Sequence, residues 1–182
     1  PLGVPREADN ETLSRGEVVA IILKGRYANL QSKSCFSDVT VQTKNSAEIC
    51  KAKELGIITP FRNGSFKPKD KAAFSEALRF FLTDHDKQKK PSARRVGGIA
   101  AVRRAKNMKI IPSGVTNTKR PITRGQMAEL MAKYADWKNK VSRAPSGGAL
   151  PAENPAAKKE PAQNASEAVL RVDFSTRYQT MA

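Results

Sequence analysis

The chain has 182 residues, a length that fits one compact domain with tails or two very small domains and excludes a large multidomain enzyme. Lys and Arg total 33 against 17 Asp and Glu, giving a formal net charge of +16, so any extended partner is expected to be a nucleic acid, an acidic glycan or an anionic membrane surface. With 39% hydrophobic and 6% aromatic residues we expect a modest core beside unfolded segments. No apolar run approaches the roughly 18 residues that a membrane-spanning helix needs.

An internal repeat opens the folded region. Leu13 to Glu17 and Ile122 to Gln126 share the order apolar, hydroxyl, Arg, Gly, Glu or Gln. In both, the hydroxyl and the acid or amide three positions later form a capping box, which starts a helix. A weaker copy stands at Phe74 to Glu76, and an apolar stripe of helical spacing follows each copy. We therefore predict central helices near residues 13–25, 72–83 and 121–136, packed through Val18, Ile21, Ile22, Phe80, Phe81, Met127, Leu130 and Met131.

A second repeat lies between these helices. Residues 48–58 and 101–111 each predict a short basic helix that leads into an Ile-Ile pair. Asn45, three positions before a glutamate, is a start signal for the first of them, and Gly56 suits the left-handed residue after its end. Residues 62–68 then predict a turn, because the Asn-Gly pair in them tolerates positive φ.

Taken together, these segments resemble the S-layer homology domain. The resemblance rests on Ser14–Glu17, Phe36–Val39, Ala52–Ile58 and Gly64–Pro68, in this order. Residues 12–82 match one full motif, and residues 99–135 match the latter part of another motif and a further start. The resemblance implies a mainly α fold, a central three-helix bundle with short prong helices, over about residues 12–136. It also implies anchoring to an anionic polysaccharide of the cell wall.

Two arginines are the main candidates for that contact. Arg15 and Arg124 stand at the first helical position, where a guanidinium can project toward an anion that also meets free backbone N–H groups. A surface ion pair with a neighbouring acid is the alternative. The resemblance adds Asp38, Gly64 and Phe66 as polymer contacts, although Asp38 would serve equally to hydrogen-bond a backbone turn.

The resemblance also places the only two cysteines near each other. Cys35 precedes a phenylalanine that the pattern sets close to the short helix carrying Cys50. It therefore implies a disulfide if the chain is exported. Two reduced, partly buried thiols remain the alternative.

The densest basic region offers a different function. It comprises Lys89, Lys90, Arg94, Arg95, Arg103 and Arg104. A nucleic-acid-binding protein could use these side chains as a phosphate footprint. However, no aromatic residue lies between Phe81 and Tyr134 to stack on bases. A solvated basic loop is the alternative.

Catalysis, metal binding and cofactor binding find little support in the sequence. The one histidine, His85, lies between two aspartates beside a lysine cluster, where we expect it to be exposed. Two cysteines and one histidine cannot supply a zinc site, and no phosphate-binding glycine loop is present. We therefore expect no enzyme activity, cofactor or metal.

The composition divides the chain into four parts: an N-terminal extension over 1–11, the helical domain over 12–140, a Pro/Ala-rich linker over 141–168 and a C-terminal segment over 169–182. Leu170 to Tyr178 alternates apolar and polar residues, which predicts a β-strand. Since a lone strand leaves its backbone unpaired, we expect this strand to pair with a neighbouring protein subunit.

We therefore expect a non-catalytic, extracytoplasmic protein of the cell envelope or cell surface. It would anchor to an anionic cell-wall polysaccharide, form part of a surface assembly, or both. The alternatives are an assembly subunit that has lost glycan binding and a basic nucleic-acid-binding protein.

Overall fold

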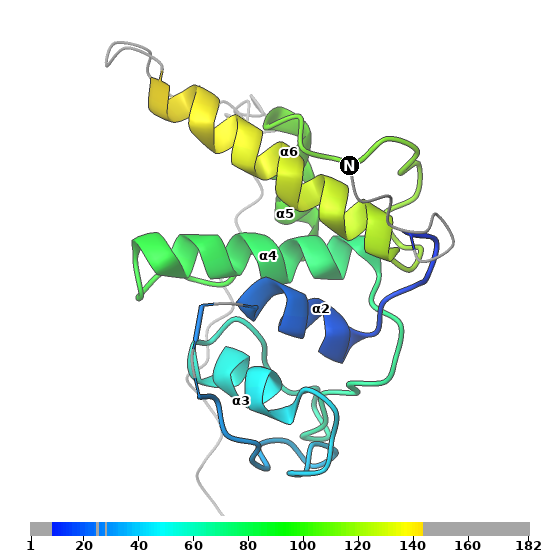
Figure 1. The fold of residues 1–182 in the computed structure, drawn as a ribbon, viewed down its shortest axis with the longest axis vertical. Coiled ribbons are helices and arrows are strands. Elements are labelled where there is room, and N and C mark those ends of the chain that lie inside the picture. The colour runs from blue at the N-terminus through cyan, green and yellow to red at the C-terminus, as the bar shows by residue number, and fades with distance from the viewer. Residues whose placement is uncertain (1–8, 25, 28, 144–182) are drawn as a thin grey trace, which may run out of the picture. The chain divides into compact units, whose positions relative to one another are not determined.

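A computed structural model of the chain describes residues 9–24, 26–27 and 29–143, which form a mainly helical unit (Figure 1). Within these ranges the helices are α2 (Arg15–Leu23), α3 (Ser46–Glu54), α4 (Phe74–Lys89), α5 (Gly98–Asn107) and α6 (Arg124–Arg143). The same ranges contain isolated β-bridges and no β-strand. The mainly α prediction is therefore confirmed for the described part of the chain.

Two helices are longer than the sequence suggested. α4 continues to Lys89 rather than ending near residue 83, and Asp84 in this extension is buried in an ion pair with Arg26. α6 continues to Arg143, so residues 141–143 are helical rather than linker, since no proline lies between Pro121 and Pro145. The rest of the predicted linker and the C-terminal strand lie outside the described residues, as do residues 1–8 of the N-terminal extension.

The predicted start signals of the outer long helices are confirmed. At α2, the backbone N–H of Glu17 donates to Ser14 Oγ, and the Glu17 carboxylate accepts from the Ser14 backbone N–H at 3.0 Å. At α6, Thr123 and Gln126 exchange the same pair of hydrogen bonds at 3.1 and 3.2 Å. α4 has Ala73 at the equivalent position and no side-chain cap.

A closed ring of backbone hydrogen bonds joins the three helix starts. The Leu13 N–H donates to the Ile122 carbonyl at 2.9 Å, the Ile122 N–H to the Ala72 carbonyl at 2.9 Å, and the Ala72 N–H to the Leu13 carbonyl at 3.0 Å. All three side chains are fully buried. The repeat in the sequence therefore corresponds to a repeat in the structure, since the residue two positions before each long helix forms one corner of the ring. We call these bonds the central ring.

The second repeat also has a shared geometry. The Ile57 N–H donates to the Ala52 carbonyl at 2.9 Å, and the Ile110 N–H donates to the Ala105 carbonyl at 3.1 Å. Gly56 ends α3 with φ of +67°, as predicted. Asn45 precedes α3, but its side chain makes no capping hydrogen bond and its backbone is left-handed, so its predicted role as a cap is wrong.

The core lies between the helices. α2 packs against α3 and α4, and α4 packs against α5 (Figure 1). α6 contacts α4 through Tyr134, whose ring meets the edge of Phe81 with 5.1 Å between centroids. All eight predicted core residues join one cluster; Val18, Ile22, Phe80, Phe81, Met127 and Leu130 are buried, and Ile21 and Met131 are partly buried.

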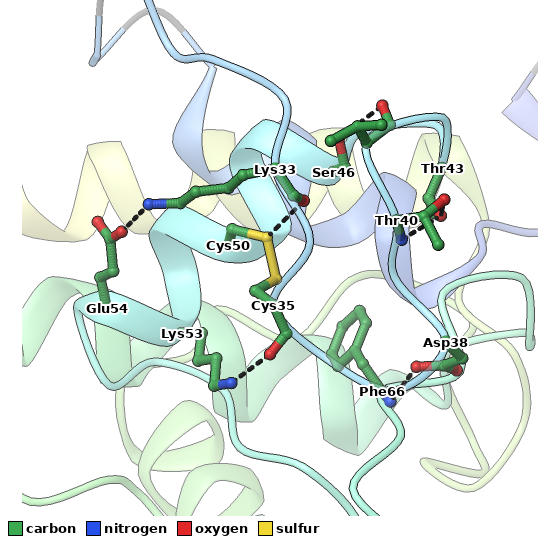
Figure 2. Close-up of a disulfide and its surroundings, with 11 residues drawn as sticks. Lys33, Cys35, Asp38, Thr40, Thr43, Ser46, Cys50, Lys53, Glu54 and Phe66 are labelled. Atoms are coloured by element: carbon green, nitrogen blue, oxygen red, sulfur yellow. Dashed lines mark hydrogen bonds and ion pairs between the residues drawn. A yellow bond between two sulfur atoms is a disulfide. The ribbon is translucent and has the colours of Figure 1, made fainter.

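A disulfide fixes the long connection between α2 and α3. Figure 2 shows Cys35, on that connection, bonded to Cys50 of α3, with 5.6 Å between their Cα atoms. Beside it, Lys53 donates to the Cys35 carbonyl and Lys33 pairs with Glu54. The bonded pair replaces the alternative of two reduced thiols.

Candidate functional site

Three equivalent junctions surround the central ring. In each, the first residue of a long helix donates its backbone N–H, at 2.9 Å, to a carbonyl of the segment that leads into another of the long helices. The first junction pairs Arg15 with Asp70, the second pairs Phe74 with Arg120, and the third pairs Arg124 with Glu11. The side chains of Arg15, Phe74 and Arg124 therefore occupy equivalent positions, and their surroundings differ.

The first junction encloses Arg15. Its side chain pairs with the Glu76 carboxylate and donates from Nε to the Phe66 carbonyl at 2.8 Å. The guanidinium carbon lies 4.8 Å from the centre of the Phe61 ring and 4.6 Å from that of Phe66. Arg15 is only 5% exposed, so its guanidinium does not project past the helix end as expected. Its partners are all internal, which gives it a structural role.

The other predicted polymer contacts of this region build the turn over Arg15. The Asp38 carboxylate accepts from the backbone N–H groups of Phe66 and Lys67, both at 2.7 Å, and Figure 2 shows the first of these bonds. Gly64 has φ of +79°, and its carbonyl accepts from the Ser37 N–H at 3.1 Å. Phe66 is fully buried. Asp38 therefore hydrogen-bonds a backbone turn, which was the alternative to polymer contact.

The third junction leaves Arg124 accessible. Its guanidinium pairs with Glu11 at 3.1 Å, and both side chains are about half exposed. An exposed pair of this kind contributes little free energy, so the arginine can exchange its partner for another anion.

The second junction contains a cavity of about 220 Å³. We call it the polar cavity; it is lined by Phe74, Gly114, Val115, Thr116, Asn117, Arg120, Pro121, Thr123 and Gln126. The loop over residues 114–121 forms one wall and the first turn of α6 forms another. The lining therefore includes the hydroxyl or amide residues Thr116, Asn117 and Gln126 together with one arginine, Arg120.

The other side of the same loop borders an open groove of about 470 Å³. We call it the apolar groove; it is lined by Ser75, Gly98, Ile99, Val102, Arg103, Lys106, Thr118 and Lys119. The two sites share no lining residue. Residues of loop 114–121 therefore line two depressions of different chemistry.

The predicted basic region does not act as one unit. Arg104 pairs with Asp86 at 2.6 Å, and that hydrogen bond raises the pKa of Arg104. Arg95 donates to Thr59, while Lys89, Lys90 and Arg94 are exposed. Arg103 lines the apolar groove.

Four basic side chains line the polar cavity or the apolar groove. Among the described residues, Arg103, Lys106, Lys119 and Arg120 form no salt bridge. Two of them, Lys119 and Arg120, were not among the site residues predicted from the sequence. A signal did exist, because Gly114 matches Gly64 at the same distance from the next helix start, and both have φ of +79°.

His85 is half-buried rather than exposed as expected. Its ring lies 4.6 Å from the centre of Phe81 and 4.3 Å from that of Tyr134. Burial lowers the pKa of His85 and raises that of Tyr134. The histidine is packed between aromatic rings, which suits a core contact better than proton transfer.

Two further features bear on the class of site. In the part of the chain that the structure describes, no group of His, Cys, Asp or Glu side chains could hold a metal ion. None of the described helices combines the length and apolarity needed to cross a membrane.

Comparison with models of known protein families gave no match, and comparison with curated proteins gave none either.

Proposed function

We propose that the protein is a non-catalytic module of the cell envelope that binds an anionic cell-wall polysaccharide at the second junction. The proposal includes a fold similar to the S-layer homology domain, with α2, α4 and α6 as a central three-helix bundle and α3 and α5 as prongs. The repeated helix starts and the central ring support this relationship. The disulfide supports an extracytoplasmic location, because disulfides persist in oxidising compartments.

The observation that carries the proposal is the chemistry of the polar cavity. Hydroxyl and amide side chains there can exchange hydrogen bonds with sugar hydroxyls, and Arg120 can bind a carboxylate or phosphate with two parallel N–H groups. A cavity of about 220 Å³ is below the range of pockets for drug-sized ligands, which suits one sugar unit of a longer chain.

The proposal moves the anion contact away from Arg15. Because that guanidinium is buried and paired, an anion would have to displace Glu76 to reach it. Arg124 is accessible and serves as an additional contact. Assembly through the predicted strand over Leu170 to Tyr178 stays a prediction outside the described residues.

A binding assay with matched probes tests the proposal. A carboxylated wall polysaccharide, the same polymer with its carboxyl groups reduced, and duplex DNA are titrated at two salt concentrations. Arg120→Lys keeps the charge but loses the bidentate geometry, so it should weaken binding of the carboxylated polymer about tenfold.

The control is Arg94→Lys, since Arg94 is exposed and lies outside both sites. It should bind the polymer as the parent does. Equal binding by Arg120→Lys and the parent would contradict the proposed site. Binding of DNA in preference to the carboxylated polymer would favour the nucleic-acid alternative instead.

A further inference from the structure

We propose that the apolar groove is a docking site for an acidic segment of another protein, which inserts an apolar side chain between Ile99 and Val102. The inference does not depend on glycan binding, because the groove and the polar cavity have no lining residue in common.

One apolar side chain that lines the groove is unusually exposed to solvent. Ile99 is 90% exposed, more than any other large hydrophobic side chain of the described residues. It stands on α5 in one stripe with Val102, Arg103 and Lys106, at spacings of three, four and seven positions. The opposite stripe, with Ala101 and Ala105, is fully buried. α5 therefore exposes the Ile99 side chain to the groove, beside Val102, which is partly buried against the core.

Three basic residues at the rim of the groove favour an acidic occupant. Arg103 and Lys106 on α5 face Lys119 on loop 114–121 across the groove. None of the three forms a salt bridge within the described ranges. A segment with carboxylates on either side of an apolar residue complements both the rim and the floor.

Other occupants fit less well. A second copy of this chain is disfavoured, because 33 basic against 17 acidic residues make the copies repel each other. A polysaccharide or nucleic acid would pair with the rim but leave the Ile99 side chain against polar groups.

A defined peptide tests the inference. The probe is a fluorescein-labelled peptide whose central leucine is flanked by three glutamates on each side, titrated into the full chain by fluorescence anisotropy. Two comparison peptides replace the leucine by serine or the glutamates by glutamines. We expect saturable binding of the first peptide alone, and at least tenfold weaker binding of the other two.

Protein variants locate the binding. Ile99→Ser and Lys106→Glu should each weaken the peptide complex about tenfold. The matched controls are Val41→Ser, at a side chain that is 55% exposed, and Lys69→Glu, at an exposed lysine outside the groove; both should bind as the parent does. Since Ile99 is almost fully exposed, its substitution should also leave the melting temperature unchanged.

Three results would overturn the inference. One is the absence of saturable binding by the leucine peptide, and another is equal binding by Ile99→Ser and the parent. The third is loss of binding to phosphatidylglycerol vesicles in Ile99→Ser without any change in peptide binding, which would assign the groove to a membrane instead.

Discussion

The residues at equivalent positions of the three junctions differ in burial and in their contacts. Arg15 is enclosed by two aromatic rings, a carbonyl and a carboxylate, whereas Arg124 forms one exposed ion pair. Phe74 takes the same position at the second junction and forms part of the wall of the polar cavity. The second junction thus has a cavity beside Phe74, whereas the Arg15 side chain at the first junction is enclosed by its partners.

This difference predicts unequal effects of mutation. Removal of Arg15 takes the donor from the Phe66 carbonyl and leaves Glu76 with Arg79 alone, at 3.6 Å, so Arg15→Ala should lower the free energy of unfolding by about 3 kcal/mol. Arg124→Ala should cost less than about 1 kcal/mol, because its pair is exposed. Urea denaturation of both variants measures the two values, and similar losses would contradict the assigned roles.

The capping box of α2 makes stability depend on pH. Hydrogen bonds from the Ser14 backbone N–H, and then from Lys44 and the Ser14 hydroxyl, lower the pKa of Glu17 from an ordinary 4.5 to about 2 despite partial burial. Because the folded pKa is the lower one, the ionised carboxylate stabilises the fold above pH 4.5, and that contribution is lost as the pH falls toward 2.

Glu17→Gln tests this contribution without removing the cap. The equivalent box of α6 already uses Gln126, so the amide should keep the hydrogen bonds to the hydroxyl residue. We expect the variant to lose about 1 kcal/mol at pH 7 and to show a flatter fall in stability between pH 4.5 and 2. An unchanged pH profile would show that Glu17 does not titrate with folding.

At the scale of elements, the disulfide holds the connection from α2 to the turn over Arg15. Phe36, next to Cys35, stacks on Phe66 with 5.3 Å between ring centroids. The bond closes a loop with a sequence separation of 15, for which the chain-entropy model gives about 3 kcal/mol.

Replacing Cys35 and Cys50 together by Ser should therefore lower the free energy of unfolding by about 3 kcal/mol. The same loss should appear when the parent protein is unfolded in the presence of a reductant, which is the internal control. A reductant that leaves the parent unchanged would show that the thiols are free in solution.

The sequence predicts the elements better than the site. Capping boxes are local, so Ser14 with Glu17 and Thr123 with Gln126 marked the helix starts correctly. The burial of Arg15 depends on Glu76, which is 61 positions away, and no local pattern reports such a pair. The polar cavity lies between Phe74, loop 114–121 and the start of α6, and no local sequence pattern reports how such distant segments pack.

At the scale of the whole molecule, the central ring ties segments that are far apart in the chain. The amides of Leu13, Ala72 and Ile122 are buried at its corners, so they should exchange with deuterium only on global unfolding. We expect similar, high protection for all three by hydrogen exchange with NMR detection. Fast exchange at any one of them would show that the ring is open in solution.

The proposal of glycan binding at the second junction is tested most directly by titrating the ¹⁵N-labelled protein with an oligosaccharide that contains carboxylated sugars. We predict that amide shifts will concentrate in loop 114–121 and at Thr123 and Gln126, and that Arg120→Lys will require about tenfold more ligand for the same shifts. Shifts confined to the basic residues 87–95, or no shifts at any ligand concentration, would contradict the account.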